Sequence, residues 1–430
     1  MKKTFSIISL GCPRNLVDSE CLISEFKAKG YVFKENPIGV QVLAINTCSF
    51  VEDAKKESID IILKAIDAKK KGEVKKLIVA GCLPERYIDE LKEELEEVDE
   101  FRGVLGLNDK LLFKSKLELT PSHYAYIKIS EGCKNRCSYC VIPYLKGPYK
   151  SRPIDSIIKE AETLINKGVK EIILIGQDTS LYGIDLYGKK RLSELLKRLG
   201  DVSQDNWIRL LYSHPANLTK EVIEVIRDSR NICKYIDLPV EHISDKVLKA
   251  MGRKTKKNDI ISLIEYIRET IPDVGLRSSL IVGFPGETDE DFYELLSFIE
   301  KTKFERLGLF RYSREEGTPA YRYKNQVSED KKEKRFKEAM LLQQEISKDI
   351  NEGFKGRVLN VLIDEKSEDG YLGRTEYDAP EVDGSVYVKL AKTKVSNGPR
   401  KRGLKPGNFC NVRITDTYNY DLVGEYEFTE

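Results

Sequence analysis

The sequence predicts an α/β protein that carries a small all-β domain at its C-terminal end. Over roughly the first 350 residues, short apolar runs alternate with charged amphipathic stretches, the order typical of parallel sheets with crossover helices. After Phe354 this helical period disappears, and alternating or β-branched runs separated by Gly-rich turns take its place. The length of 430 residues fits two to four domains. We expect three, at residues 1–119, 120–350 and 351–430.

The first domain is predicted to be a parallel α/β sheet. Its apolar runs lie at residues 5–10, 42–46 and 77–80, with a weaker run at 104–107. Helix-like stretches at 18–29, 51–68 and 86–98 separate them. Because a helix lies between each pair of consecutive strands, neighbouring strands can run in the same direction.

The second domain repeats the strand–helix unit six times. Its apolar runs occupy residues 125–129, 171–175, 207–212, 235–239, 276–282 and 306–310. Six such units with right-handed crossovers curl into a partial (β/α)6 barrel. The charged stretch 328–353 is then expected to be a connecting helix. It leads to runs at 358–364, 385–390 and 411–415, which predict a small antiparallel β-barrel.

Composition and charge exclude several classes of protein. Lys and Arg number 72 and Asp and Glu 70, so a net charge of +2 provides no global attraction to nucleic acid or anionic membranes. No apolar run approaches 18 residues, which argues against a membrane span. The N-terminus shows no small-residue cleavage site. Nine cysteines without an export signal favour thiolate chemistry or metal binding over disulfides, and they indicate a cytoplasmic protein.

The strongest local signal is a set of three closely spaced cysteines, Cys133, Cys137 and Cys140. They follow the first predicted barrel strand, so all three thiolates can reach one inorganic centre. Thiolates are the preferred ligands of iron–sulfur clusters, which usually take four of them. With no fourth cysteine nearby, one iron would stay open to an external molecule. Zinc, which prefers a closed set of four ligands, and a disulfide with a spare thiol are the alternatives.

A second set consists of Cys12, Cys48 and Cys82, each just past the C-terminal end of an apolar run. If those runs are neighbouring parallel strands, the three thiols share the carboxyl edge of the sheet, where open α/β sheets bind ligands. The pattern predicts a second cluster with an open iron, and three separate buried apolar cysteines are the alternative. The remaining cysteines, Cys21, Cys233 and Cys410, are expected to be structural.

The CxxxCxxC spacing, with Tyr139 before the last cysteine, resembles the radical S-adenosylmethionine superfamily. The resemblance implies that the open iron binds the methionine amino and carboxylate groups and that the reduced cluster cleaves the sulfonium to a 5′-deoxyadenosyl radical. It also implies cofactor contacts from Tyr139 in the cysteine loop, from polar residues at the strand ends, and from two residues on the fifth strand. The strand-end residues are Gln177, Asp178, Ser213, His214 and Glu241, and those on the fifth strand are Arg277 and Ser279. Asp178 fits a helix cap equally well, and Tyr139 fits an ordinary core position.

Four further segments lie at residues 9–20 (SLGCPRNLVDSE), 177–183 (QDTSLYG), 312–320 (YSREEGTPA) and 373–384 (GRTEYDAPEVDG). They are similar to motifs of the RimO-type methylthiotransferases, which modify ribosomal protein uS12, and the resemblance covers essentially the whole chain. It implies a TRAM-like C-terminal barrel and two 4Fe-4S clusters. It also implies two uses of S-adenosyl-L-methionine, as methyl donor and as radical source. The product would be an aspartate of uS12, free or in the small ribosomal subunit, methylthiolated at its β-carbon, with a reductant such as flavodoxin or ferredoxin. The chain has Glu241 before His242 where the family more often has Gln.

Two other functions stay open. A tRNA (adenosine) methylthiotransferase of the MiaB type would share the chemistry, and a non-catalytic iron–sulfur electron-transfer scaffold would not need a polar barrel. RNA contact is not favoured, because residues 352–430 hold 12 Lys and Arg against 14 Asp and Glu, a net charge of −2. The basic patch 400–402 is expected to be a solvated loop. Four carboxylates, Glu376, Asp378, Glu381 and Asp383, predict an acidic surface suited to a basic protein partner.

Overall fold

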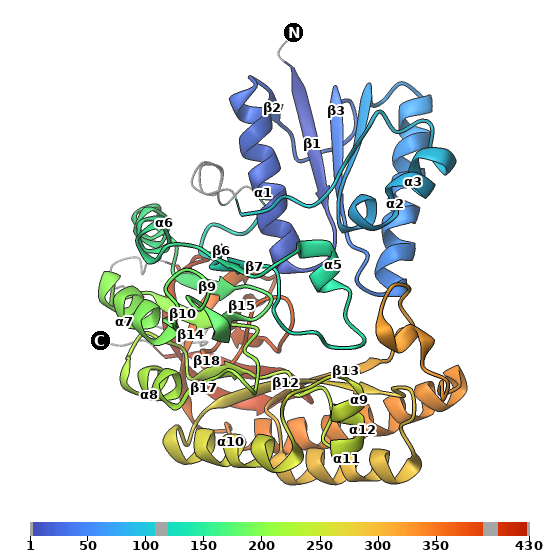
Figure 1. The fold of residues 1–430 in the computed structure, drawn as a ribbon. Coiled ribbons are helices and arrows are strands. Elements are labelled where there is room, and N and C mark those ends of the chain that lie inside the picture. Colours follow the sequence, from blue (N-terminus) through green and yellow to red (C-terminus); the bar gives the residue numbers. More distant parts are fainter. Residues whose placement is uncertain (1–2, 108–118, 390–402, 428–430) are drawn as a thin grey trace, which may run out of the picture.

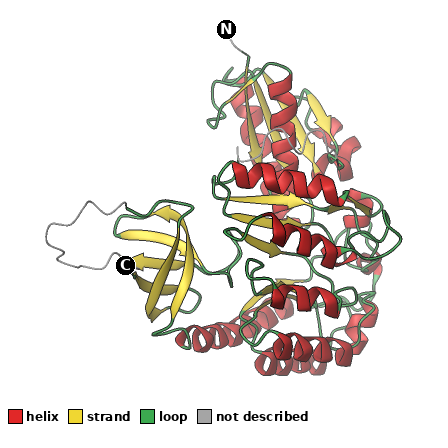
Figure 2. Ribbon diagram, turned by 90° about the vertical axis from the view of Figure 1, so that its left-hand side faces the viewer, coloured by secondary structure: helices red, strands yellow, loops and turns green. Residues whose placement is uncertain are grey.

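The computed structural model describes residues 3–107, 119–389 and 403–427 (Figure 1). The N-terminal sheet lies at one end of the molecule, next to the central strand–helix units. The C-terminal barrel lies to one side of the central units (Figure 2). This arrangement confirms the predicted class of an α/β protein with a small all-β domain.

The N-terminal domain is a five-stranded parallel sheet in the order β2-β1-β3-β4-β5. Its strands are β1 (Thr4–Ser9), β2 (Val32–Phe33), β3 (Val42–Thr47), β4 (Lys76–Gly81) and β5 (Glu100–Arg102), and its helices are α1 (Pro13–Ala28), α2 (Glu52–Lys70) and α3 (Cys82–Glu94). Separate apolar clusters fill the two faces of the sheet. The strand predicted at 104–107 lies instead at β5, where a single apolar residue between charged neighbours provides little pattern.

Six parallel strands form the central domain: β6 (Tyr124–Lys128), β9 (Glu171–Ile175), β10 (Trp207–Leu210), β11 (Tyr235–Asp237), β12 (Gly275–Val282) and β13 (Arg306–Arg311). They make two three-stranded sheets, β10-β9-β6 and β11-β12-β13, which a single bridge between Ile208 and Ile232 joins. In the described ranges no pairing closes the ring between β6 and β13, as expected for a partial barrel.

The helices of the central domain pack on the outer face of its strands. They are α6 (Ile154–Asn166), α7 (Leu192–Val202), α8 (Lys220–Asp228), α9 (Asp245–Ala250), α10 (Lys257–Thr270), α11 (Asp289–Thr302) and α12 (Glu329–Glu352). Short elements complete it: β7 (Ser130–Glu131), α5 (Ile142–Lys146), β8 (Lys150–Ser151), η1 (Thr179–Leu181) and η2 (Pro319–Arg322). Strand residues alternate between two clusters, so Ala125 and Ile127 face the helices whereas Tyr124 and Tyr126 face the barrel interior.

The C-terminal domain is a closed five-stranded barrel in the order β14-β15-β16-β18-β17. Its strands are β14 (Val358–Lys366), β15 (Gly370–Arg374), β16 (Val386–Lys389), β17 (Phe409–Thr417) and β18 (Leu422–Tyr426). The antiparallel expectation is wrong for one pair, since β16 and β18 run parallel. A closed ring with an odd number of strands cannot alternate direction throughout, so at least one pair must be parallel.

The predicted acidic surface at residues 376–383 is wrong, because most of its carboxylates are turned inward. Asp378 accepts hydrogen bonds from Arg306 (2.8 Å) and Thr375 (2.6 Å), and Asp383 accepts from the Tyr235 hydroxyl (2.7 Å). The loop between β15 and β16 therefore enters the central barrel, whose buried arginines require carboxylate partners. The basic patch at 400–402 lies outside the described residues. The boundaries at 119/120 and 350/351 stay predictions.

Across the described ranges, every helix is too short or too polar to cross a lipid bilayer.

Candidate metal centre

Cys12, Cys48 and Cys82 come together at the carboxyl edge of three neighbouring strands. Cys12 precedes α1 after β1, Cys48 follows β3, and Cys82 begins α3 directly after β4. Asn15 holds the first two connections together, since its side-chain amide donates to the carbonyl oxygens of Leu10 (2.6 Å) and Thr47 (3.1 Å). The parallel topology thus produces the juxtaposition that the sequence predicted.

Glycines allow the backbone to approach these cysteines closely. Gly11 has φ +87°, and a Cβ there would lie 2.7 Å from the Cβ of Cys48 and 3.0 Å from its Sγ. Gly81 has φ +96°, and its Cβ would lie 2.3 Å from the side-chain oxygen of Asn46. Since any larger residue would displace a cysteine connection, the space around the triad depends on these glycines.

Charge distinguishes the three thiols of this N-terminal triad. Burial alone would raise the pKa of Cys12, but the Arg14 guanidinium, whose Nε lies 3.5 Å from Sγ, holds that pKa below its ordinary value. Burial raises the pKa of Cys48, and it raises the pKa of Cys82 to about 12. Cys12 is therefore the thiol that ionises most readily in the absence of a metal.

The second triad, Cys133, Cys137 and Cys140, lies in the loop between β7 and α5. Ser138 fixes this loop, because its N–H donates to the Met251 carbonyl (2.8 Å) and its hydroxyl to the Ala250 carbonyl (2.8 Å). Burial raises the pKa of Cys133 to about 11 and raises that of Cys140 further. A cavity of about 550 Å³ reaches Cys133 and is also lined by Arg136, Tyr149 and Asp185.

The N-terminal triad touches the segment that follows the second triad at the domain boundary. Cys82 packs against Val141, which directly follows Cys140, and against Leu145 of α5. Arg14 crosses the boundary as well: its Nη1 donates to the Gly176 carbonyl (3.2 Å), and its guanidinium lies 4.5 Å from the ring centroid of Tyr212.

A buried charge network reinforces this contact. Asp18 of α1 accepts hydrogen bonds from Lys128 (2.5 Å) and Lys146 (2.9 Å) of the central domain. Lys128 also donates to Glu131 (2.6 Å). Burial disfavours the Lys128 ammonium, but the two carboxylates raise its pKa. Breaking such a buried pair is costly, so α1 and the cysteine at its head are held firmly against the barrel.

The donor sets fit iron–sulfur clusters better than single metal ions. Among the residues that the structure describes, no group of three Cys, His, Asp or Glu side chains converges on a single-ion site. A cubane cluster is bound at separate iron corners, so its thiolates stand farther apart than the ligands of one ion. The triad places three thiols on one edge of the sheet, where Gly11 lets the backbone pass close to Cys48.

Among the predicted cofactor contacts, Gln177 and Ser213 present unused polar atoms at the barrel mouth. Gln177 follows β9 and donates to Glu131 (2.7 Å), whereas its Oε1 has no hydrogen-bond partner among the described residues. The buried Ser213 hydroxyl after β10 likewise lacks a described partner. Buried polar atoms are seldom left unpaired, so both atoms are suited to a ligand.

Asp178 and His214 are more fully engaged by the protein. Asp178 accepts from Asn135 (2.8 Å) and Asn217 (2.9 Å) and caps η1 through the Ser180 N–H. It thus has the capping role that the sequence left open. Burial lowers the pKa of His214 to about 2, so its ring is neutral, and its Nδ1 accepts from the Ala216 N–H (3.1 Å).

Arg277 and Ser279 lie within β12, the fifth strand of the central domain, as expected. Arg277 forms ion pairs with Asp237 (2.9 Å) and with Asp383 of the inserted loop (3.5 Å). These pairs commit Arg277 to the domain contact. Ser279 pairs in register with Gly308 of β13, next to the exposed Phe310 two residues farther along that strand.

Tyr139 and Glu241 lie together beside the second triad. Tyr139 packs edge-on against Phe284, with ring centroids 6.4 Å apart, and lies near the Glu241 carboxyl group. Burial raises the pKa of Glu241 although Arg253, 4.0 Å away, opposes this. Sequence analysis missed Arg253 and Arg14. Arg14 had a signal in its position two residues after Cys12, whereas Arg253 had none.

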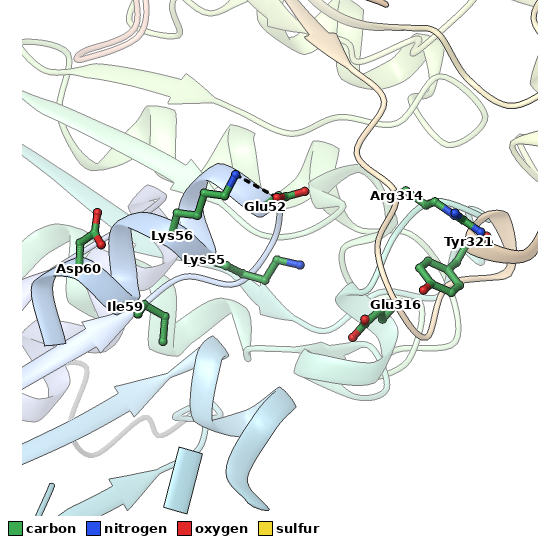
Figure 3. A pocket seen from close by; sticks show the side chains of 8 residues that line it. All are labelled: Glu52, Lys55, Lys56, Ile59, Asp60, Arg314, Glu316 and Tyr321. Carbon is green, nitrogen blue, oxygen red and sulfur yellow. Dashed lines mark hydrogen bonds and ion pairs between the residues drawn. The ribbon is translucent and has the colours of Figure 1, made fainter. Parts of the chain in front are cut away.

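A second cavity of about 540 Å³ lies between α2 and the segment after β13 (Figure 3). Its lining mixes three basic and three acidic side chains: Lys55, Lys56, Arg314, Glu52, Asp60 and Glu316. It borders the junction between the N-terminal and central domains.

Comparison with known proteins agrees with this architecture. Residues 4–103 match an uncharacterized protein family (UPF0004), residues 127–299 the radical SAM superfamily, and residues 356–426 the TRAM domain. The ribosomal protein uS12 methylthiotransferase RimO of Pelodictyon phaeoclathratiforme is 46% identical over 429 residues, with 97% of each chain covered. The RimO protein of Clostridioides difficile is 46% identical over 441 residues, again with 97% of each chain covered.

Solved structures share the fold at low identity. The radical S-adenosylmethionine methyltransferase TsrM from Kitasatospora setae, with cobalamin and a [4Fe-4S] cluster bound, has a TM-score of 0.54 at 13% identity. That match covers 84% of this chain and 81% of TsrM. Identity over nearly the full length, together with the three matched domains, shows that the chain belongs to the RimO family of radical S-adenosylmethionine methylthiotransferases.

Proposed function

We propose that this enzyme transfers a methylthio group to the β-carbon of an aspartate in ribosomal protein uS12, free or in the small subunit. The observation that carries the proposal is the meeting of two cysteine triads across one domain boundary, with Cys82 packed against Val141. A scaffold that only carries electrons does not need a second triad facing a polar barrel mouth. The substrate is taken from the relatives, which are named as uS12 methylthiotransferases.

In this proposal Cys133, Cys137 and Cys140 hold one 4Fe-4S cluster, and Cys12, Cys48 and Cys82 hold the other. When bound, the clusters and S-adenosylmethionine supply the electron, the carbon radical, the methyl group and the sulfur carrier. The chain's own contribution is to hold these groups apart at a fixed separation and to keep the substrate carbon between them.

Side chains at the barrel mouth would orient S-adenosylmethionine. The unpaired Oε1 of Gln177 suits the methionine ammonium, and the Ser213 hydroxyl can donate to the carboxylate. His214 is neutral, so its ring adds no charge. Tyr139 and Glu241 would lie against the adenosyl group, and Ser279 would face the substrate. Asp178 and Arg277 would be positioning residues, since protein partners already bind their charged groups.

A reductant such as flavodoxin or ferredoxin would supply electrons, and a ribosomal substrate would place the protein in the cytoplasm. RNA contact is not favoured, because many basic residues of the C-terminal barrel are already paired. Arg374, for example, bonds to Asp364 (2.8 Å), and Arg413 bonds to Glu427 (2.5 Å). The division at 119/120 and 350/351 belongs to the same proposal.

The test uses anaerobically reconstituted, reduced enzyme with S-adenosylmethionine and either uS12 or tRNA. We expect a methylthio mass shift on uS12 alone. Modification of tRNA alone would assign the chain to the other substrate class. Failure to form 5′-deoxyadenosine would favour the electron-transfer scaffold. Iron analysis should give about eight irons, and about four in either triple Cys→Ala variant.

A further inference from the structure

We infer that the loop of residues 313–320, here called the clasp loop, fixes the separation of the two cysteine triads, with Glu315 as its central positioning residue. The inference rests on the proposed function, because it treats both triads as cluster ligands. It assigns a role to a segment that touches neither triad's sulfur atoms but contacts residues next to both.

The clasp loop is tied to the N-terminal triad through Glu315. The Glu315 side chain is buried, and its Oε2 accepts from Lys55 of α2 (2.9 Å) and from Arg86 of α3 (2.8 Å). The same Arg86 nitrogen donates to the carbonyl of Ser49 (2.9 Å), the residue that follows Cys48. One carboxylate therefore connects the loop to the backbone beside an N-terminal cysteine.

The other end of the clasp loop is tied to the second triad. The Ala320 N–H donates to the Ser138 carbonyl (2.8 Å), and Ser138 lies between Cys137 and Cys140. Tyr312, just before the loop, and Ala320 belong to the apolar cluster that also contains Phe284 and contacts Tyr139. Movement of this end would therefore displace the CxxxCxxC loop.

Bonds inside the loop make it a stiff link between these two ends. The Ser313 hydroxyl donates to Glu315 Oε1 (2.7 Å), and the Thr318 hydroxyl donates to the Glu315 carbonyl (2.6 Å). The N–H of Glu52 approaches the Ser313 oxygen at 3.4 Å. Both oxygens of the Glu315 carboxylate are thus bound, one by the loop and one by the N-terminal domain.

A cavity lies beside this contact, between α2 and the clasp loop. Figure 3 shows Lys55 extending from α2 toward the segment that carries Arg314 and Glu316, across the cavity of about 540 Å³. The two charged bonds of Glu315 join α2 and α3 to the loop beside this cavity. Glu316 is exposed and binds Arg86 through its backbone carbonyl only (2.7 Å).

The experiment compares Glu315→Gln with Glu316→Gln as the matched control. Both variants are reconstituted with iron and sulfide, and electron paramagnetic resonance relaxation measures the magnetic interaction between the two reduced clusters. For Glu315→Gln we expect about eight irons and retained 5′-deoxyadenosine formation, because both clusters still bind. The magnetic interaction between the clusters should change, and the yield of methylthiolated product should fall roughly hundredfold, as for a misplacement of reacting groups by about 1 Å. Glu316→Gln should match the wild type.

Wild-type cluster interaction and product yield in Glu315→Gln would overturn the inference. Should that variant fail to fold, Arg86→Gln, which leaves Glu315 bound to Lys55, tests the same link and is judged by the same two outcomes. A wild-type enzyme that binds only one cluster, or that leaves uS12 unmodified, would instead refute the proposed function.

Discussion

Replacing Asp378 with asparagine should loosen the C-terminal barrel from the central domain. Asp378 is 2% exposed and accepts two hydrogen bonds from the Arg306 guanidinium (2.8 and 2.5 Å) and one from Thr375 (2.6 Å). Removing one partner of a buried ion pair costs about 3–5 kcal/mol. Asp383 also stabilises the positive charge of Arg306, so we expect the stability of the loop contact to fall by an amount near the lower limit, about 3 kcal/mol.

Amide hydrogen exchange of the peptide spanning residues 374–384 measures this loss. The Ala379 N–H is buried and donates to Asp383 (2.8 Å), so it exchanges only when the loop opens. A loss of about 3 kcal/mol corresponds to roughly 150-fold faster exchange. The control is Glu381→Gln on the same loop, since Glu381 is exposed and accepts only from the Tyr124 hydroxyl (2.9 Å) in the described structure. Equal protection in the two variants would refute the claim that buried charge holds the loop.

Three other predictions concern the cysteine site and pH. Gly11→Ala places a Cβ 2.7 Å from that of Cys48, so elemental analysis of the reconstituted variant should show about four irons fewer. The control is Gly30→Ala, which has a similar φ (+81°) but open surroundings and should keep all of its iron. Equal iron in the two variants would contradict the steric argument. In the apoprotein, iodoacetamide should label Cys12 before Cys82 at neutral pH, because the lower pKa of Cys12 gives more thiolate. Arg14→Ala should slow the labelling of Cys12, and equal labelling rates of Cys12 and Cys82 in mass spectrometry would disprove this prediction. Burial lowers the pKa of His214 to about 2 and of His242 to about 3, so the unfolded state binds more protons below pH 6.5. The free energy of unfolding should therefore decrease as the pH falls, by about 1.7 kcal/mol per histidine between pH 6.5 and 5, and a urea midpoint that is constant over this range would count against it.

Periodic patterns allowed most of the fold to be predicted. Most strands of the N-terminal sheet and central barrel are largely apolar runs, because both of their faces are buried. All six central runs start within one residue of the observed strand start. Two strands of the C-terminal barrel, β15 and β18, were missed. They contain glycines whose Cβ atoms would clash with a neighbouring strand, such as Gly370 at 2.2 Å from the Val388 carbonyl oxygen. Glycine at such positions interrupts the alternation on which strand prediction depends.

The cysteines themselves were evident from their spacing and from their positions after apolar runs, since the carboxyl ends of parallel strands lie on a common edge of the sheet. Contacts between distant segments were not predictable in this way. The acidic run at 376–383 looks like a solvated surface in the sequence, yet Asp378 is buried against Arg306 of another domain. Arg277, expected at the cofactor, is paired with Asp383. A charged side chain is paired or solvated according to what the folded chain brings within a few ångströms of it. The sequence alone therefore determined which cysteines share one sheet edge or one loop as candidate ligands, and only the tertiary structure decided which charges hold the domains together around them.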